Sequence, residues 1–277
     1  MCQPSCLVAR PRAPVGHTVG VQRFTASDGV AIAFHSFPAE QPRAGFPPVL
    51  LQHGFAADSH VNWVTFGTVE SLNAAGRAVI AVDARGHGAS DKPHDPAYYG
   101  ESRMAQDLAE LLDHLEIESI DLVGYSMGAI VALILATTDS RIRRMVVGGV
   151  GASVAEMDDA GAPRFDGSLL AAALRAPRPA DVVDAAARSF RFFAESTGAD
   201  LLALAAQADS VHRARIALER ITVPTLVLAG DADPLAERPE VLAHAIHGAQ
   251  LHLVRGEHLG VVGRPEFKDA IVAFLSG

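Results

Sequence analysis

The chain has 277 residues, of which 49% are hydrophobic and 20% charged, and its formal net charge is −9. A chain of this length buries about three quarters of its extended surface, enough for a full core without disulfides or metals. The composition excludes a disordered chain and a collagen, and the acidic excess argues against a nucleic-acid-binding protein. The longest apolar run, residues 129–136, is far shorter than the roughly twenty residues that span a bilayer, so we expect no membrane segment.

Residues 1–18 contain both cysteines, Cys2 and Cys6, together with three prolines. These cysteines are too close to the chain start to staple the core, and no nearby residues complete a zinc-ligand pattern. The segment also lacks the basic region followed by an apolar stretch that marks a secretory signal. We therefore expect a flexible tail on a cytoplasmic protein.

Short β-type runs alternate with helical patterns along most of the chain. The first two runs, residues 19–24 and 30–37, flank Ser27-Asp28-Gly29, which predicts an antiparallel hairpin. Six further runs are apolar almost throughout, as strands buried on both faces must be: 49–52, 78–82, 120–123, 145–150, 225–229 and 250–254. Helical spacing lies between them at 104–115, 127–136, 240–246 and 265–275. The pattern predicts an α/β fold with an eight-stranded, mostly parallel sheet and helices on both faces.

One long segment interrupts this alternation. Residues 151–222 contain no convincing strand and hold alanine-rich helical patterns at 169–174, 182–193 and 201–208. The strand pattern resumes after Pro224. We predict a sheet domain made of residues 19–150 and 223–277, interrupted by a helical insert over residues 151–222.

The strongest local motif is Gly124-Tyr125-Ser126-Met127-Gly128, between a predicted strand and a predicted helix. A serine at such a sharp turn stands exposed above the sheet, and the glycines two positions away on either side relieve crowding. The amino end of the helix behind it offers N–H groups where an oxyanion would form. The motif therefore predicts that Ser126 is a nucleophile.

A serine hydroxyl needs a base and an orienting carboxylate, and the loops after the last two predicted strands offer both. Asp231 and Asp233 follow the strand at 225–229, and His258 follows the strand at 250–254. On an extended segment the two aspartates would point the same way, so the residues alone do not decide between them. Glu257 adjoins the histidine and is expected to be a solvated loop residue.

Together these motifs resemble the α/β-hydrolase fold family, over residues 19–275. The resemblance rests on five segments, namely His53-Gly54-Phe55, residues 83–90, residues 124–128, residues 230–234 and residues 256–258. By this resemblance the insert over residues 151–222 is a cap that roofs the site.

The resemblance also implies a role for individual residues. Ser126 matches the nucleophile, Asp233 the acid and His258 the general base of a catalytic triad. The backbone N–H groups of Phe55 and Met127 match the oxyanion hole.

Several other residues admit more than one role. Four aromatic residues are candidates to line the substrate pocket, although core packing is the simpler explanation for the tryptophan and the phenylalanines: Trp63, Tyr125, Phe190 and Phe193. His53 and His87 are expected to brace the loops in which they lie. His244 and His247 are three residues apart on a helical pattern, but no third ligand is apparent, so we expect no metal site.

The resemblance is strongest to small serine carboxylesterases, enol-lactonases and cofactor-free perhydrolases. Haloalkane dehalogenases and epoxide hydrolases of the family use aspartate where this chain has Ser126, which argues against those activities. We expect hydrolysis of a small-molecule ester through an acyl-enzyme, with no cofactor. The sequence leaves open a lactone, thioester, peptide or carbon–carbon substrate, perhydrolysis, a slow ligand-sensing receptor, and assembly with copies of itself.

Overall fold

The computed structural model describes residues 20–157 and 167–277. In this part of the chain, eight strands form one sheet in the order β1-β2-β4-β3-β5-β6-β7-β8. β2 pairs antiparallel with both β1 and β4, and all the other neighbouring strands are parallel. The strands are β1 (Gln22–Thr25), β2 (Ala31–Phe37), β3 (Val49–Gln52), β4 (Val79–Asp83), β5 (Ile120–Tyr125), β6 (Ile142–Gly148), β7 (Thr225–Gly230) and β8 (Gln250–Val254). The predicted fold class is confirmed, whereas the tail predicted for residues 1–18 lies outside the described residues.

The strands form where apolar runs lie between turn-forming residues. β3, β4, β5 and β7 are buried along their whole length, because helices cover both faces of the sheet. In the turn between β1 and β2, Gly29 adopts a φ of +87°, which glycine reaches without strain. β6 begins at Ile142 and not at the predicted residue 145, because Ile142 and Arg144 already pair with Ile120 and Asp121 of β5.

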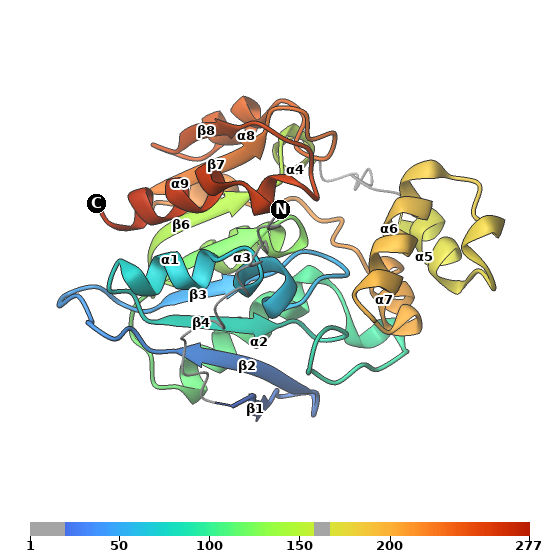
Figure 1. The fold of residues 1–277 in the computed structure, drawn as a ribbon, viewed down its shortest axis with the longest axis horizontal. Helices are drawn as coiled ribbons and strands as arrows, with labels where there is room; N and C mark the ends of the chain where they lie inside the picture. The colour runs from blue at the N-terminus through green and yellow to red at the C-terminus, as the bar shows by residue number, and fades with distance from the viewer. Residues whose placement is uncertain (1–19, 158–166) are drawn as a thin grey trace, which may run out of the picture.

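Helices cover both faces of the sheet (Figure 1). α1 (Thr68–Ala74) and α9 (Pro265–Leu275) share one apolar cluster with one face of the sheet. α2 (Glu101–His114), α3 (Met127–Ala136) and α8 (Pro239–Ala245) share a second cluster with the opposite face. The two clusters are the core of the sheet domain, and they hold the carboxyl ends of the parallel strands in fixed positions.

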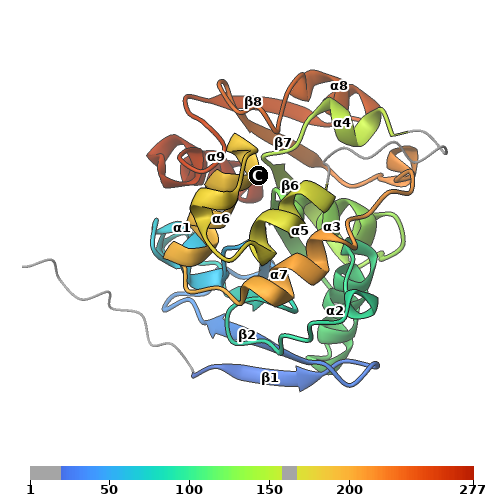
Figure 2. The same ribbon diagram turned by 90° about the vertical axis from the view of Figure 1, so that its right-hand side faces the viewer.

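Between β6 and β7, the described residues form helices and no strand. α4 (Ala152–Ala155) packs against α8, whereas α5 (Gly167–Arg175), α6 (Ala185–Ser196) and α7 (Leu201–Ala208) pack on one another and lie in front of the sheet in Figure 2. Ala56, in the loop after β3, is buried in the same apolar cluster as α5 and α7. The hydroxyl of Thr197 donates to the carbonyl of Ala56 at 2.9 Å, so these helices cover that loop.

Short helical turns connect the longer elements. They are η1 (His60–Val64), η2 (Pro96–Tyr98), η3 (Pro179–Asp181), η4 (Leu218–Arg220) and η5 (Val261–Gly263). Within residues 20–157 and 167–277, every helix is too short or too polar to cross a membrane.

Candidate active site

Ser126 lies at the sharp turn between β5 and α3, with φ +54° and ψ −115°. A non-glycine residue reaches this conformation only when its surroundings hold it there. The flanking glycines allow the close packing that does so. A Cβ on Gly124 would lie 2.2 Å from the carbonyl oxygen of Gly128, and a Cβ on Gly128 would lie 2.2 Å from that of Gln52. The turn therefore depends on glycine at both positions.

A hydrogen-bonded chain joins three side chains from three loops. His258 follows β8, and its Nε2 lies 2.9 Å from the Oγ of Ser126. Its Nδ1 lies 2.8 Å from the Oδ2 of Asp233, which follows β7 and whose side chain is fully buried. The carboxylate can only accept, so Nδ1 donates and Nε2 is left to accept the serine proton. The structure brings the three predicted triad residues together.

The loop after β7 turns, so its two aspartates point in different directions. Asp231 is exposed, and its Oδ1 accepts the N–H of Gly256 at 2.9 Å. Asp233 is directed inward, and its Oδ1 accepts the N–H of Leu235 at 2.8 Å. Asp231 therefore ties the two loops together, while Asp233 faces the histidine. Glu257 is exposed, as expected for a solvated loop residue.

Two backbone N–H groups flank Ser126. Gly54 packs so closely on the serine that a Cβ there would lie 3.4 Å from the Cβ of Ser126. In the described ranges, the N–H of Phe55 donates to no protein oxygen. Met127 is the first residue of α3, where an N–H has no acceptor inside the helix. Both positions match those predicted for the oxyanion hole.

His53 and His87 brace the loop that carries Phe55. The Nδ1–H of His53 donates to the carbonyl of Gly54 at 2.8 Å, and the Nε2 of His87 accepts the N–H of Ala56 at 3.2 Å. Because C=O and N–H point in opposite directions in a trans peptide, the His53 bond turns the N–H of Phe55 away from that histidine. Burial lowers the pKa of both imidazoles, to about 3 for His87, so both are neutral near pH 7.

Tyr125 contacts His258, the histidine of the hydrogen-bonded chain. Its hydroxyl donates to the carbonyl oxygen of His258, and the two rings lie 5.3 Å apart. Burial raises the pKa of Tyr125 well above its ordinary value, which keeps the hydroxyl as a neutral donor. Tyr125 therefore fixes the backbone from which the imidazole extends.

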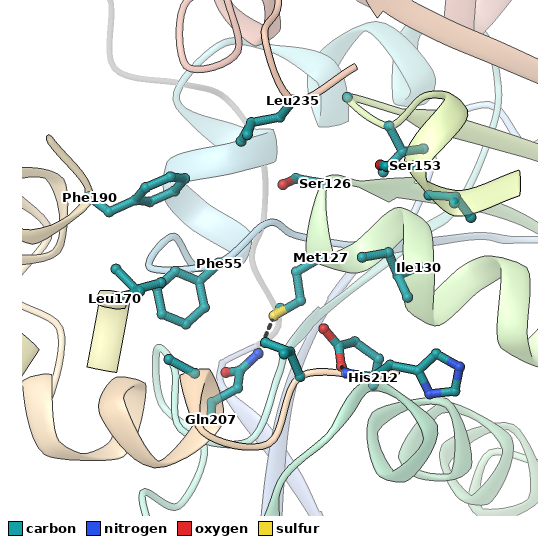
Figure 3. Close-up of a pocket in the computed structure, with 16 residues that line it drawn as sticks. Phe55, Ser126, Met127, Ile130, Ser153, Leu170, Phe190, Gln207, His212 and Leu235 are labelled. Carbon is teal, nitrogen blue, oxygen red and sulfur yellow. Dashed lines mark hydrogen bonds between the residues drawn. The ribbon is translucent and has the colours of Figure 1, made fainter. Parts of the chain in front are cut away.

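Ser126 opens onto two cavities. The larger has a volume of about 140 Å³, and Figure 3 shows the Ser126 hydroxyl directed into it. The smaller has a volume of about 80 Å³ and is lined by His258 and Tyr125. Phe55 and Phe190 line both cavities, as Ser126 does, and so lie where the two cavities adjoin. This arrangement offers a separate space to each side of a bond under attack at Ser126.

Three of the four predicted pocket residues lie at these cavities. Phe190 lines both, and Tyr125 and Phe193 line the smaller one. Trp63 does not line either. It is fully buried on η1 and packs in the core cluster of α1 and α9, so its predicted place in the pocket is wrong. Core packing, the simpler explanation that the sequence analysis gave for this residue, agrees with the structure.

Sequence reasoning missed most of the larger cavity. Its wall includes Ile130 of α3, Leu170 of α5, Gln207 of α7 and Leu235 of the loop after β7. A signal existed for Gln207, because it is the one polar residue in the apolar helix α7.

The described residues show no group of three or more His, Cys, Asp or Glu side chains arranged to hold a metal ion. The Nδ1 of His244 bonds to the carbonyl of Glu240 within its own helix, at 2.6 Å.

Comparisons with known proteins show the family to which the chain is related. Residues 47–196, more than half of the chain, match the α/β-hydrolase fold. The chain is 30% identical to the serine hydrolase BPHL of Mus musculus over 75% of this chain and 72% of that protein. It is 28% identical to 3-oxoadipate enol-lactonase 2 of Acinetobacter baylyi, over 71% of this chain and 78% of the enzyme. The chain is also 35% identical to the 2-hydroxy-6-oxo-2,4-heptadienoate hydrolase of Pseudomonas putida. This match spans 48% of this chain and 46% of that protein, less than half of each.

A solved structure extends the likeness to the whole fold. A hydrolase from Pseudomonas aeruginosa PA01 is 28% identical, with a TM-score of 0.71 over 94% of this chain and 99% of that chain. Shared sequence and shared topology thus lead to the same conclusion, that the chain belongs to the α/β-hydrolase fold family.

Proposed function

We propose that the protein is a serine hydrolase that cleaves a carboxylic ester of a small molecule through an acyl-enzyme. The observation that carries this proposal is the chain of hydrogen bonds from Asp233 through His258 to Ser126, at the point where two cavities meet. A serine within reach of a base that a third group orients is an activated nucleophile. The serine hydrolase among the relatives supports the proposal.

The first half of the reaction forms the acyl-enzyme. Ser126 Oγ attacks the acyl carbon while His258 Nε2 takes its proton, and Asp233 keeps the imidazole in the required tautomer and stabilises the imidazolium. The oxyanion of the tetrahedral intermediate accepts hydrogen bonds from the N–H groups of Phe55 and Met127. Each such donor contributes about 3 kcal/mol of transition-state stabilisation.

Departure of the alcohol completes the acyl-enzyme and assigns the two cavities. His258 Nε2 must protonate the alcohol oxygen as its bond to the acyl carbon breaks, so the alcohol lies on the side of His258, which lines the smaller cavity. The acyl group then occupies the larger cavity, which Met127 and Ile130 line. Water takes the place of the alcohol, His258 removes its proton, and attack on the acyl-enzyme releases the acid and restores Ser126.

The test is hydrolysis of p-nitrophenyl acetate, butyrate and octanoate by the wild type and by Ser126→Ala. We expect kcat/KM to fall by about 10⁴-fold or more, because binding and the backbone N–H groups alone leave little catalysis. Ser189→Ala is the matched control, because Ser189 is exposed on α6 and its hydroxyl donates to the carbonyl of Ala185 in the same helix. Retained activity in Ser126→Ala, or an equal loss in Ser189→Ala, would contradict the proposal.

Lactone hydrolysis is a second candidate, because 3-oxoadipate enol-lactonase 2 is among the relatives that match most of the chain. The same steps apply, except that the leaving alcohol stays attached to the acyl group. Comparing kcat/KM for δ-valerolactone with that for ethyl pentanoate separates the two candidates. A higher value for the lactone would make the protein a lactonase, and a higher value for the open ester would make it an esterase.

A further inference from the structure

A buried glutamine lies in the largely apolar wall of the larger cavity. Gln207 lies on α7, 1% exposed, and lines the cavity together with Phe55, Leu170 and Val211 (Figure 3). A glutamine on this face costs side-chain entropy and desolvation that a leucine would avoid. Its presence there therefore calls for a hydrogen-bond partner.

The protein provides a partner for only one end of the amide. The Nε2 of Gln207 lies 2.6 Å from the Sδ of Met127 and 3.9 Å from the Sδ of Met104. Thioether sulfurs can only accept, so the NH₂ group faces them and the oxygen faces away. Among the described residues, the Oε1 of Gln207 has no hydrogen-bond donor, although it is buried. Buried acceptors are almost always paired, so this oxygen is an exception that a ligand would remove.

The other buried acceptor of this wall is already engaged. The Oε2 of Glu101 accepts the backbone N–H of His212 at 2.6 Å. Gln207 is therefore a buried side chain of this wall whose acceptor oxygen has no protein donor among the described residues.

The position of Gln207 relative to Ser126 identifies which part of a substrate it meets. The larger cavity holds the acyl group, because the alcohol must lie beside His258. Met127 directly follows Ser126, and its side chain reaches from the oxyanion hole to the amide of Gln207. An acyl chain that runs along Met127 thus meets Gln207 at its far end and not at its carbonyl.

We propose that Gln207 is a specificity-determining residue that selects acyl groups with a hydrogen-bond donor, an O–H or an N–H, at their far end. The proposal rests on the proposed function, because it takes the acyl group to be the part bound in the larger cavity. The donor pairs with Oε1 of Gln207, while the apolar wall around it packs on the intervening carbons.

Matched p-nitrophenyl esters test this proposal. Each pair has one member with a terminal hydroxyl and one with a methyl group in its place, as in 6-hydroxyhexanoate and heptanoate or 8-hydroxyoctanoate and nonanoate. Shorter hydroxy esters that close to five- or six-membered lactones are avoided. We expect at least one hydroxyl ester to exceed its methyl partner in kcat/KM by about tenfold, which corresponds to about 1.4 kcal/mol for one neutral hydrogen bond.

Two variants show whether Gln207 causes the preference. Gln207→Met keeps the length and volume of the side chain and removes the amide, so the ratio of kcat/KM between the hydroxyl ester and its methyl partner should fall to about one. Val211→Ala enlarges the same cavity without changing any hydrogen bond, so it should change both rates and leave their ratio intact. A preference that survives in Gln207→Met, or no preference in the wild type, would overturn the proposal.

Binding to Ser126→Ala separates this proposal from the proposed function. That variant keeps the cavity. In competition with its methyl partner, the hydroxyl ester should bind with a Kd about tenfold lower, whether or not the wild type hydrolyses either ester. Suppose that the wild type hydrolyses neither ester, that the Kd difference is present in Ser126→Ala, and that adding Gln207→Met abolishes it. The proposed function then fails, and the binding role of Gln207 stands. Ser126-dependent hydrolysis with equal Kd values would leave the esterase and refute the role of Gln207.

Discussion

Replacing Asp233 by asparagine tests whether the buried carboxylate sets the tautomer of His258. One carboxylate oxygen accepts the N–H of Leu235 at 2.8 Å, and the other faces Nδ1 of His258 at 2.8 Å. In the variant, the amide oxygen must keep the N–H of Leu235, because a backbone N–H only donates. The amide NH₂ then faces Nδ1, which becomes an acceptor, and the imidazole proton moves to Nε2. In this tautomer Nε2 cannot take the proton of Ser126.

The expected magnitude follows from losing the base while keeping the rest of the site. We expect kcat for p-nitrophenyl butyrate to fall by about 10⁴-fold in Asp233→Asn, with the fold unchanged by circular dichroism. Asp231→Asn is the matched control. It is exposed, and asparagine still accepts the N–H of Gly256, so kcat should stay within about twofold. Equal losses in the two variants, or a larger loss in Asp231→Asn, would refute the assignment of the acid.

Three further predictions concern the support of the site. Gly128→Ala places a Cβ 2.2 Å from the carbonyl oxygen of Gln52 and should lower the free energy of unfolding in urea by about 3 kcal/mol or more. In the control Gly260→Ala the nearest atom lies at 3.9 Å, so the loss should be under about 0.5 kcal/mol. Similar losses in the two variants would contradict the packing argument. His53→Phe removes the bond that orients the oxyanion-hole peptide, so kcat should fall about tenfold or more with KM nearly unchanged, and a loss confined to KM would contradict this role. Burial holds the pKa of His87 at about 3. Below pH 6.5 the imidazole of His87 therefore binds a proton in the unfolded chain but not in the folded chain, so the free energy of unfolding falls as the pH falls. Between pH 7 and pH 4 this contributes about 3 kcal/mol, and urea unfolding of His87→Gln should show a correspondingly smaller pH dependence; an equal dependence would refute it.

Much of the fold could be predicted from the chain alone. Strands β3 and β8 and helices α3, α7 and α9 have the predicted bounds, because each is a run of apolar residues or of helical spacing between residues that break it. The order of strands and helices then left a parallel sheet as the one arrangement that covers both faces. These signals are local, so they can be read without knowing where the rest of the chain lies.

The turn that carries the candidate nucleophile could be predicted for the same reason. Strand, serine and helix follow one another directly, and Gly124 and Gly128 mark the tight turn around Ser126. The choice between Asp231 and Asp233 was different, because it depends on how the loop after β7 turns. Only the structure shows one carboxylate facing solvent and the other facing His258.

Contacts between distant residues were decided by tertiary structure alone. His258 and Ser126 are 132 positions apart, and Gln207 and Met127 are 80 apart. Trp63 shows the same limit, since its indole lies in the core although it follows the loop of the active site. Residue spacing determines local conformation, but the side chains that share a cavity are determined by how the helices of the insert pack over the carboxyl ends of the strands.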